Sequence, residues 1–342
     1  MKNFLVLTVA LIVCLPLYLS ANLGKILVEN PNGTSSLHIT FAAAVTAAQS
    51  GASVYLPAGY WEENVTISKR LNIYGVGHYP NSSPITPGTS KINSLTFLNN
   101  TDSTTIQGLI IVNGLSFGNG SSVAVRNHFY LRCNIGGSFN IANSGTTAIS
   151  NHIFKECIIN SLTTYNPTLP NNIIFTNCFF TAVGNLRGSN IYFTNCIFAS
   201  SNYFQNGTSR NLLIENSIFM RTSGDPFYYL ESSIINNCIF LSATVTWGSN
   251  AGVDNILNQN CAGTFVSGVC TSFSYAGDYH LKAGSPGEDA GTDGTDIGVY
   301  GGSSPFKDGG LPVIPSIKTF SVSKNPVDGK IQVQATAVSQ TE

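Results

Sequence analysis

Charged residues are scarce in this sequence of 342 residues. Only 10% are Asp, Glu, Lys or Arg, against roughly 25% in a typical soluble domain. Hydrophobic residues make up 43%, so the low charge is not that of a disordered chain, and Asn, Ser, Thr and Gly must cover the surface. The 16 basic and 17 acidic residues nearly cancel and form no basic run. This argues against nucleic acid as a partner, because phosphate neutralisation needs clustered Lys and Arg.

Paired carboxylates are also lacking. Between residues 100 and 275 there are six carboxylates and six basic side chains, with no Asp-Asp or Asp-x-Asp pair. Glycoside hydrolysis needs two or three converging carboxylates, and a polysaccharide lyase needs a base together with Ca²⁺ or Arg. The sequence therefore favours a protein that is not an enzyme, with a lyase or hydrolase as the alternative.

Long apolar runs are confined to the first 21 residues. Lys2 precedes an apolar core over residues 4–19, and Leu19-Ser20-Ala21 is a plausible cleavage site, which together are typical of a signal peptide. Polar residues follow too soon for a membrane span. We therefore expect an exported protein (extracellular, on the cell surface or periplasmic) with no membrane span after cleavage, in a compartment where cysteines can pair.

One short phrase recurs along the middle of the chain and ends each time at a cysteine or its replacement. Its last residues are Cys133, Cys157, Cys178, Cys196, Ser217 and Cys238. The spacings are 24, 21, 18, 21 and 21 residues, which indicates one structural coil for each unit. A unit of this size cannot bury its apolar side alone, so neighbouring units must stack.

Aligning the phrases gives two apolar columns that should face inward, with the thiols as small buried hydrophobes between them. Three residues before the cysteine column stand Tyr130, Phe154, Phe175, Phe193, Ile214 and Ile235. Two residues after it stand Ile135, Ile159, Phe180, Phe198, Phe219 and Phe240.

The residue before the cysteine column is asparagine in four consecutive coils: Asn177, Asn195, Asn216 and Asn237. Asparagine tolerates the left-handed conformation of a tight corner, and its amide can bond the same amide about 4.8 Å away in the next coil. An asparagine ladder between two short strands predicts an all-β fold, a right-handed parallel β-helix over residues 22–305.

The two ends fit this architecture. Residues 37–49, preceded by Ser or Thr and followed by Gly51, predict a short amphipathic helix that caps the first coil. Residues 306–342 predict a linker and a tail hairpin, with strands over 316–323 and 330–338, packed on the coil body because two strands alone are marginal in water.

A further apolar column follows the cysteines directly, although strict alternation would make it face outward. It consists of Ile158, Phe179, Ile197, Ile218 and Ile239. Such a ridge is too continuous for exposure in a monomer. We expect the tail hairpin to cover it, with a partner protein or a dimer as the second interpretation and an irregular strand that turns the column inward as the third.

Two segments carry a resemblance to known proteins. The first segment resembles the first coils of pectate-lyase-like β-helix proteins and comprises residues 53–61, 65–69 and 71–75. The second is similar to the closing motif of many secreted bacterial β-helix repeat proteins and comprises residues 279–286, 289–291 and 296–298. The resemblance covers about residues 25–305. It implies the fold but no single activity, since lyases, polygalacturonases, pectin esterases and proteins without a known reaction share it. None of the enzymes' motif residues is matched here.

Charged side chains align in two places. Arg132 and Glu156 occupy the asparagine column in adjacent coils, and Arg210 and Glu231 also stack. The simplest interpretation is two ion pairs at the rim, each contributing about 0–1 kcal/mol. The functional alternative is a sugar-binding or lyase patch formed by Arg132, Lys155 and Glu156.

Histidines, aspartates and cysteines give the remaining candidates. His128 and His152 share a column, so they predict either a hydrogen-bonded pair in an early coil or a metal or acid–base site. Asp289, Asp293 and Asp296 lie among glycines, which is typical of turns and allows Ca²⁺ as the only candidate cofactor. Cys261 and Cys270 lie outside the cysteine column, in a loop-like stretch, and are the disulfide candidate.

From the residues alone we expect a monomeric, non-catalytic β-helix that binds a polysaccharide or another cell-surface component. Long flat faces of Asn, Thr, Ser and aromatic residues suit repeated hydrogen bonding and sugar stacking. A polysaccharide lyase or glycoside hydrolase is the second hypothesis, and a structural or adhesion surface protein is the third.

Overall fold

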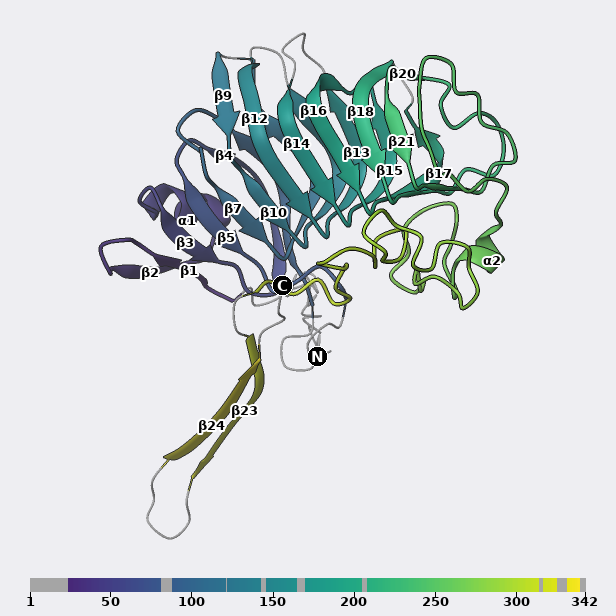
Figure 1. The fold of residues 1–342 in the computed structure, drawn as a ribbon. Helices are drawn as coiled ribbons and strands as arrows, with labels where there is room; N and C mark the ends of the chain where they lie inside the picture. The colour runs from purple at the N-terminus through teal and green to yellow at the C-terminus, as the bar shows by residue number, and fades with distance from the viewer. Residues whose placement is uncertain are drawn as a thin grey trace, which may run out of the picture.

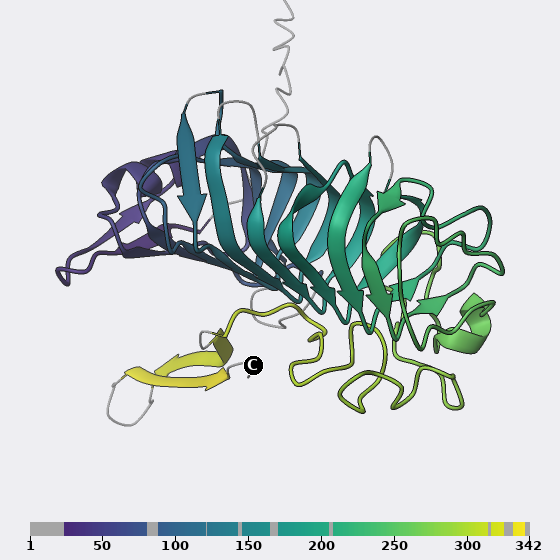
Figure 2. The ribbon, with the colours of Figure 1, turned by 45° about the horizontal axis from the view of Figure 1, so that its top comes forward.

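The computed structural model describes residues 24–80, 88–120, 122–142, 146–164, 170–204, 208–313, 316–324 and 331–338. The predicted signal peptide over residues 1–21 lies outside them. The chain winds into a stack of coils with short strands on its faces (Figures 1 and 2). This is the predicted parallel β-helix, and no helix among the described residues is long and apolar enough to cross a membrane.

The first sheet has thirteen strands and is parallel from β3 onward. Its main path is β2 (Ser35–His38), β1 (Ile26–Glu29), β3 (Ala52–Tyr55), β5 (Leu71–Tyr74), β7 (Thr105–Gln107), β10 (Phe129–Leu131), β12 (Thr146–Lys155), β14 (Asn171–Thr176), β16 (Arg187–Thr194), β18 (Ser209–Glu215) and β20 (Leu230–Glu231). Two more strands pair beside this path: β9 (Val123–Arg126) with β12, and β21 (Ile234–Asn236) with β18.

The second sheet has nine strands in strict coil order. They are β4 (Gly59–Ile67), β6 (Ser90–Phe97), β8 (Leu109–Phe117), β11 (Asn134–Ala142), β13 (Ile158–Thr164), β15 (Phe179–Gly184), β17 (Ile197–Tyr203), β19 (Ile218–Phe219) and β22 (Ile239–Phe240). Each strand of the second sheet follows one of the first sheet, and the corner between them is short except between β5 and β6, where residues 75–89 intervene. Consecutive coils therefore stack strand on strand.

The register of the strands confirms the columns predicted from the repeat. Phe154 pairs with Phe175 and Phe175 with Phe193, and both apolar columns are fully buried. Their rings stack from coil to coil, with centroids 4.9 Å apart between Phe154 and Phe175 and 4.8 Å apart between Phe198 and Phe219. The core is therefore a set of aromatic stacks that run along the solenoid axis.

The capping helix is shorter than predicted. Helix α1 spans Phe41–Ala47 and begins after Thr40, whose side chain accepts a hydrogen bond from the Ala43 backbone N–H. Leu37 belongs instead to β2, which pairs antiparallel with β1, and it is 59% exposed. The predicted start was wrong because strand pairing, which local propensity does not report, holds residues 35–38 extended. Phe41 and Val45 still bury their side chains at the first coil.

A long loop-rich segment, residues 259–313, returns along the solenoid after the last coil (Figures 1 and 2). We call it the cover. It contains α2 (Cys261–Thr264) and packs Phe265, Tyr279 and Ile297 against the apolar ridge of the second sheet. All five ridge residues are at most 5% exposed. The ridge is therefore covered, as expected, but by a segment that we had placed within the coil body.

The tail hairpin consists of β23 (Ser316–Lys324) and β24 (Ile331–Val338), which pair antiparallel. It extends away from the coils (Figures 1 and 2). The prediction that the hairpin packs on the coil body was therefore wrong. The apolar ridge that it was expected to cover is already occupied by the cover.

Candidate functional site

The four asparagines of the predicted ladder do form the corners between the two sheets. Asn177, Asn195, Asn216 and Asn237 all have a positive φ, between 48° and 53°. Their amides do not bond one another, however. Asn177 Nδ2 donates to the carbonyls of Val299 and Gly301, both at 2.8 Å. The prediction of an amide ladder at this corner was therefore wrong. These four residues, which we call the corner asparagines, bind the cover instead.

The other corner asparagines bind the cover in turn. Asn195 Nδ2 donates to Asp296 O at 3.3 Å, and Asn237 Nδ2 donates to Ala290 O at 3.2 Å. Asn216 donates to Thr292 Oγ1 and accepts from the Thr292 backbone N–H. As the cover proceeds, it meets earlier and earlier coils, so it runs against the coil order. This contact was not predictable from the sequence, because a lone asparagine column does not identify the partner of its amides.

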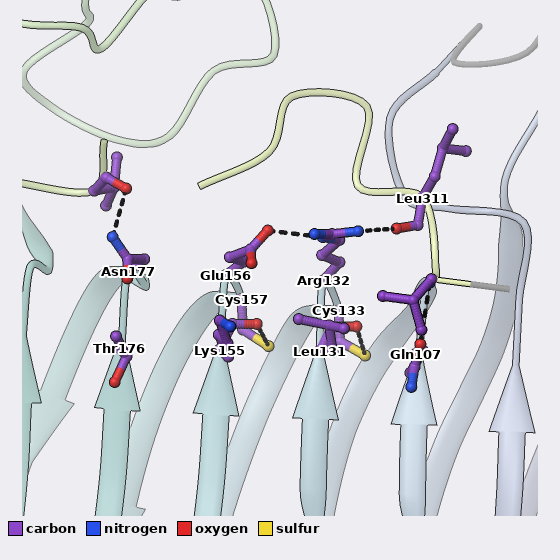
Figure 3. A network of polar contacts seen from close by, with 12 residues as sticks. Gln107, Leu131, Arg132, Cys133, Lys155, Glu156, Cys157, Thr176, Asn177 and Leu311 are labelled. Atoms are coloured by element: carbon purple, nitrogen blue, oxygen red, sulfur yellow. Dashed lines mark hydrogen bonds and ion pairs between the residues drawn. The ribbon is translucent and has the colours of Figure 1, made fainter. Parts of the chain in front are cut away.

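Arg132 and Glu156 occupy the same corner column with the same positive φ. Arg132 Nε and Glu156 Oε2 are 2.7 Å apart, and both side chains are completely buried. Arg132 Nη1 also donates to Leu311 O of the cover at 2.9 Å (Figure 3). The predicted pairing is present, but its placement at an exposed rim was wrong because the cover lies over it. The proposed patch of Arg132, Lys155 and Glu156 does not form on the surface.

We expect Glu156→Gln to lower the free energy of unfolding by about 3–5 kcal/mol, because removing one partner leaves a buried charge unpaired. The matched control is Glu231→Gln. Glu231 pairs with Arg210 at 3.2 Å, but both side chains are nearly half exposed, so its loss should cost about 0–1 kcal/mol. Urea unfolding of both variants checks this. Equal losses in the two variants would contradict the buried pair.

His128 and His152 face inward in adjacent coils, with their ring centroids 5.3 Å apart and their planes at 89°. The His128 backbone N–H donates to His152 Nδ1, and His152 Nε2 lies 3.2 Å from Val125 O. Since Nδ1 accepts, the His152 ring is neutral and donates from Nε2. Burial lowers the pKa of His128 to about 3 and that of His152 well below its usual value. The pair is hydrogen-bonded core, not an acid–base site.

The three aspartates do not converge on one point. Asp293 Oδ1 accepts from the backbone and hydroxyl of Thr295, and Asp296 Oδ1 accepts from the Asp289 backbone N–H. No group of three or more His, Cys, Asp or Glu suited to a metal ion is found in the described part of the chain. These carboxylates shape turns of the cover.

Cys261 and Cys270 form a disulfide within the cover. The five cysteines of the column, Cys133, Cys157, Cys178, Cys196 and Cys238, are free and buried. Burial raises the pKa of each thiol, which makes them unreactive small hydrophobes. The two groups of cysteines therefore have separate roles, one fixing a loop and the other filling the core.

The outer face of the first sheet carries an apolar stripe that the sequence analysis missed. It lies one residue before the inward aromatic column and consists of Phe129, Ile153, Ile174, Tyr192, Leu213 and Ile234, which are in register with one another. We call it the outer stripe. Ile153 and Ile234 are 40% and 51% exposed, and the others are partly exposed. Its signal in the sequence was the constant apolar residue four positions before each cysteine.

A row of asparagines flanks the outer stripe on one side. Asn127, Asn151, Asn172, Asn190 and Asn211 all have a positive φ. Asn172 Nδ2 donates to Asn151 Oδ1 at 2.9 Å, and Asn151 Nδ2 donates to Asn127 Oδ1 at 3.0 Å. This outer row stands six residues before the cysteine column and forms an amide ladder over its first three members, whereas Asn190 Nδ2 donates to Asn171 Oδ1 at 3.2 Å. The row lies on the surface instead of at the covered corner.

A groove of about 320 Å³ lies on the other side of the stripe, between the sheet and the cover. Its walls include Lys155, Thr176 and Thr194 from the sheet and Ser303 and Ser304 from the cover. Lys155 and Asp293, two of the predicted catalytic and metal-site candidates, both line this groove, and the strand of Lys155 ends beside the corner column (Figure 3). The face therefore combines an apolar stripe, an amide row and a groove lined with hydroxyl groups.

No protein-family model matches this chain, and no curated protein matches it in sequence. Among solved structures, one that matches is a pectin methylesterase from Aspergillus niger in deglycosylated form, at 13% identity and a TM-score of 0.33. The match covers 67% of this chain and 85% of that one. A likeness this distant carries no argument for an activity.

Proposed function

We propose that this protein is an exported, non-catalytic β-helix that binds an uncharged polysaccharide along the outer stripe. The observation that carries the proposal is an exposed apolar stripe beside a surface amide row, both repeating at the strand spacing of about 4.8 Å. A polysaccharide also repeats, with apolar C–H faces and hydroxyl groups side by side. The apolar stripe can pack against the C–H faces, and the amides of the outer row can form hydrogen bonds with the hydroxyl groups.

The charge of the face favours a neutral polymer. The stripe, the outer row and the column on the groove side contain only two charged residues, Lys155 and Glu215. Glu215 Oε1 accepts from Asn236 Nδ2 of the next coil. A polyuronate would bring one negative charge per sugar to columns whose one cation, Lys155, is accompanied by Glu215 and by Asp293 in the groove, so we expect it to bind more weakly.

Binding should depend on Tyr192, the aromatic residue near the middle of the stripe. We expect Tyr192→Ala to weaken binding to a soluble neutral β-glucan, xylan or galactomannan about tenfold, since aromatic stacking contributes roughly 1–1.5 kcal/mol. Isothermal titration calorimetry measures it. Tyr228→Ala is the matched control, since Tyr228 is 73% exposed and lies outside the stripe. If no polymer binds, or if the two variants behave alike, the proposal fails.

We expect no lyase or hydrolase activity on pectin, alginate or other uronic-acid polymers. Three of the coil carboxylates, Asp102, Glu156 and Glu231, pair with arginines. Carboxylates held by arginines are poorly suited to the paired acid and base that these reactions need. Release of reducing or unsaturated ends by the purified protein, abolished by Lys155→Ala, would instead favour the enzyme hypothesis. Self-association through the stripe without polysaccharide binding would favour the adhesion hypothesis.

A further inference from the structure

A second cavity lies on the opposite sheet, away from the outer stripe. Its floor is the outward face of β11, β13 and β15, with Asn134, Asn160 and Thr181, and its roof is the cover loop over residues 272–276. Its volume is about 630 Å³, within the range of about 300–1,000 Å³ that is typical of small-molecule sites.

The roof of this cavity is held in place by a buried tyrosine. Tyr279 Oη donates to Ser272 O at 2.9 Å and accepts from the Ser274 backbone N–H at 3.0 Å. The Cys261–Cys270 disulfide closes the chain just before the loop. Because these contacts fix the loop, little ordering is needed on binding, which favours affinity.

The aromatic wall is also fixed. Tyr275 Oη accepts from Asn134 Nδ2 at 2.7 Å, which ties the roof to the floor, and it lies 3.3 Å from His78 Nδ1. Tyr79 packs against the Tyr275 ring with centroids 4.7 Å apart. Phe273 packs on the same ring at 4.9 Å and is the second aromatic residue of the lining. Two positioned rings thus line the cavity together with the amide of Asn160 and the hydroxyl of Thr181.

We infer that this cavity binds a short uncharged oligosaccharide or the end of a neutral glycan chain. The lining has no charged residue, so it offers nothing to compensate an ionised ligand. Its aromatic faces suit the C–H face of a sugar ring, and Asn160 offers two donors and an acceptor for hydroxyl groups. This site is separate from the outer stripe and does not depend on the function proposed for it.

The test uses the intact protein with cellotriose, xylotriose and mannotriose, and trigalacturonate as the charged comparison. Calorimetry should detect binding of at least one neutral trisaccharide and weaker binding of trigalacturonate. Asn160→Ala should weaken the neutral ligand about five- to tenfold through the loss of its hydrogen bonds. Tyr228→Ala, which lies outside both the cavity and the outer stripe, should leave it unchanged. Replacing Cys261 and Cys270 together with Ser should weaken it as well, because the roof is then less well fixed.

Three outcomes would overturn the inference. The first is that no neutral trisaccharide binds. The second is that binding survives Asn160→Ala and Thr181→Val but is lost in Tyr192→Ala, which would place all sugar binding on the stripe and leave the proposed function intact. The third is that trigalacturonate binds at least as tightly as the neutral sugars, which the uncharged lining does not support.

Discussion

Lowering the pH from 7 to 5 should remove about 6 kcal/mol from the free energy of unfolding, through three buried histidines. His78, His128 and His152 are at most 1% exposed. Burial lowers the pKa of His78 and of His128 to about 3, and the positive charge of Arg132 lowers that of His78 further. Burial and the neighbouring His128 lower the pKa of His152 well below its usual value.

The direction of the effect follows from proton binding. An unfolded histidine has a pKa of about 6.5 and takes up a proton below that pH. The folded rings of His78 and His128 stay neutral until about pH 3, and the pKa of His152 is also held well below its usual value. The unfolded state therefore binds more protons across this window, and the protein loses stability as the pH falls through it. Each histidine contributes about 1.4 kcal/mol for each pH unit below about 6.

Urea unfolding at pH 7, 6 and 5 measures this loss. His152→Ile is the informative variant, because the same column holds Ile173 and Ile191 in later coils. It should reduce the slope of stability against pH by about a third, whatever it does to stability at pH 7. A slope that is flat between pH 7 and 5, or unchanged in the variant, would mean that these rings are protonated in the folded protein.

The coils themselves were predictable from the sequence because their signal is local and repeated. One phrase sets the strand, the corner and the next strand, and stacking like on like follows from the need to bury the apolar side. The inward columns at Phe175 and Phe180 were correct to the residue. The hydrogen-bonded pair predicted from the shared column of His128 and His152 is also present, and it lies in the core, where later coils place aliphatic residues.

The cover was not predictable, because nothing repeats in it. Residues 259–313 contain one helix of four residues, Cys261–Thr264, and otherwise loops. Their partners are far away in the sequence: Asn177 binds Gly301, 124 residues later. The sequence does not distinguish a corner asparagine whose amide binds the next coil from one whose amide binds a segment that returns along the solenoid. The same ambiguity placed Arg132 and Glu156 at an exposed rim when they lie under the cover.

Removing the cover should destabilise the protein far more than removing the tail. Ending the chain after Val313 deletes only the linker and a hairpin that extends away from the coils (Figures 1 and 2), so the melting temperature should not change. Ending it after Asn258 exposes the ridge of the second sheet. Five large apolar residues buried by the cover contribute roughly 1.5–3 kcal/mol each, about 7–15 kcal/mol together. The shorter protein should bind a hydrophobic dye and aggregate.

A point variant tests the contacts of the cover without shortening the chain. Ile297 is 1% exposed between the cover and the ridge, and the next residue, Gly298, donates its N–H to Asn216 O at 2.8 Å. Ile297→Asp places a carboxylate in this apolar layer, which costs several kcal/mol and should release the cover locally. Dye binding should then rise while the β-sheet circular dichroism persists, because the coils keep their own core. If Ile297→Asp and the protein ending at Asn258 are both as stable and dye-negative as the full chain, the cover does not protect the ridge.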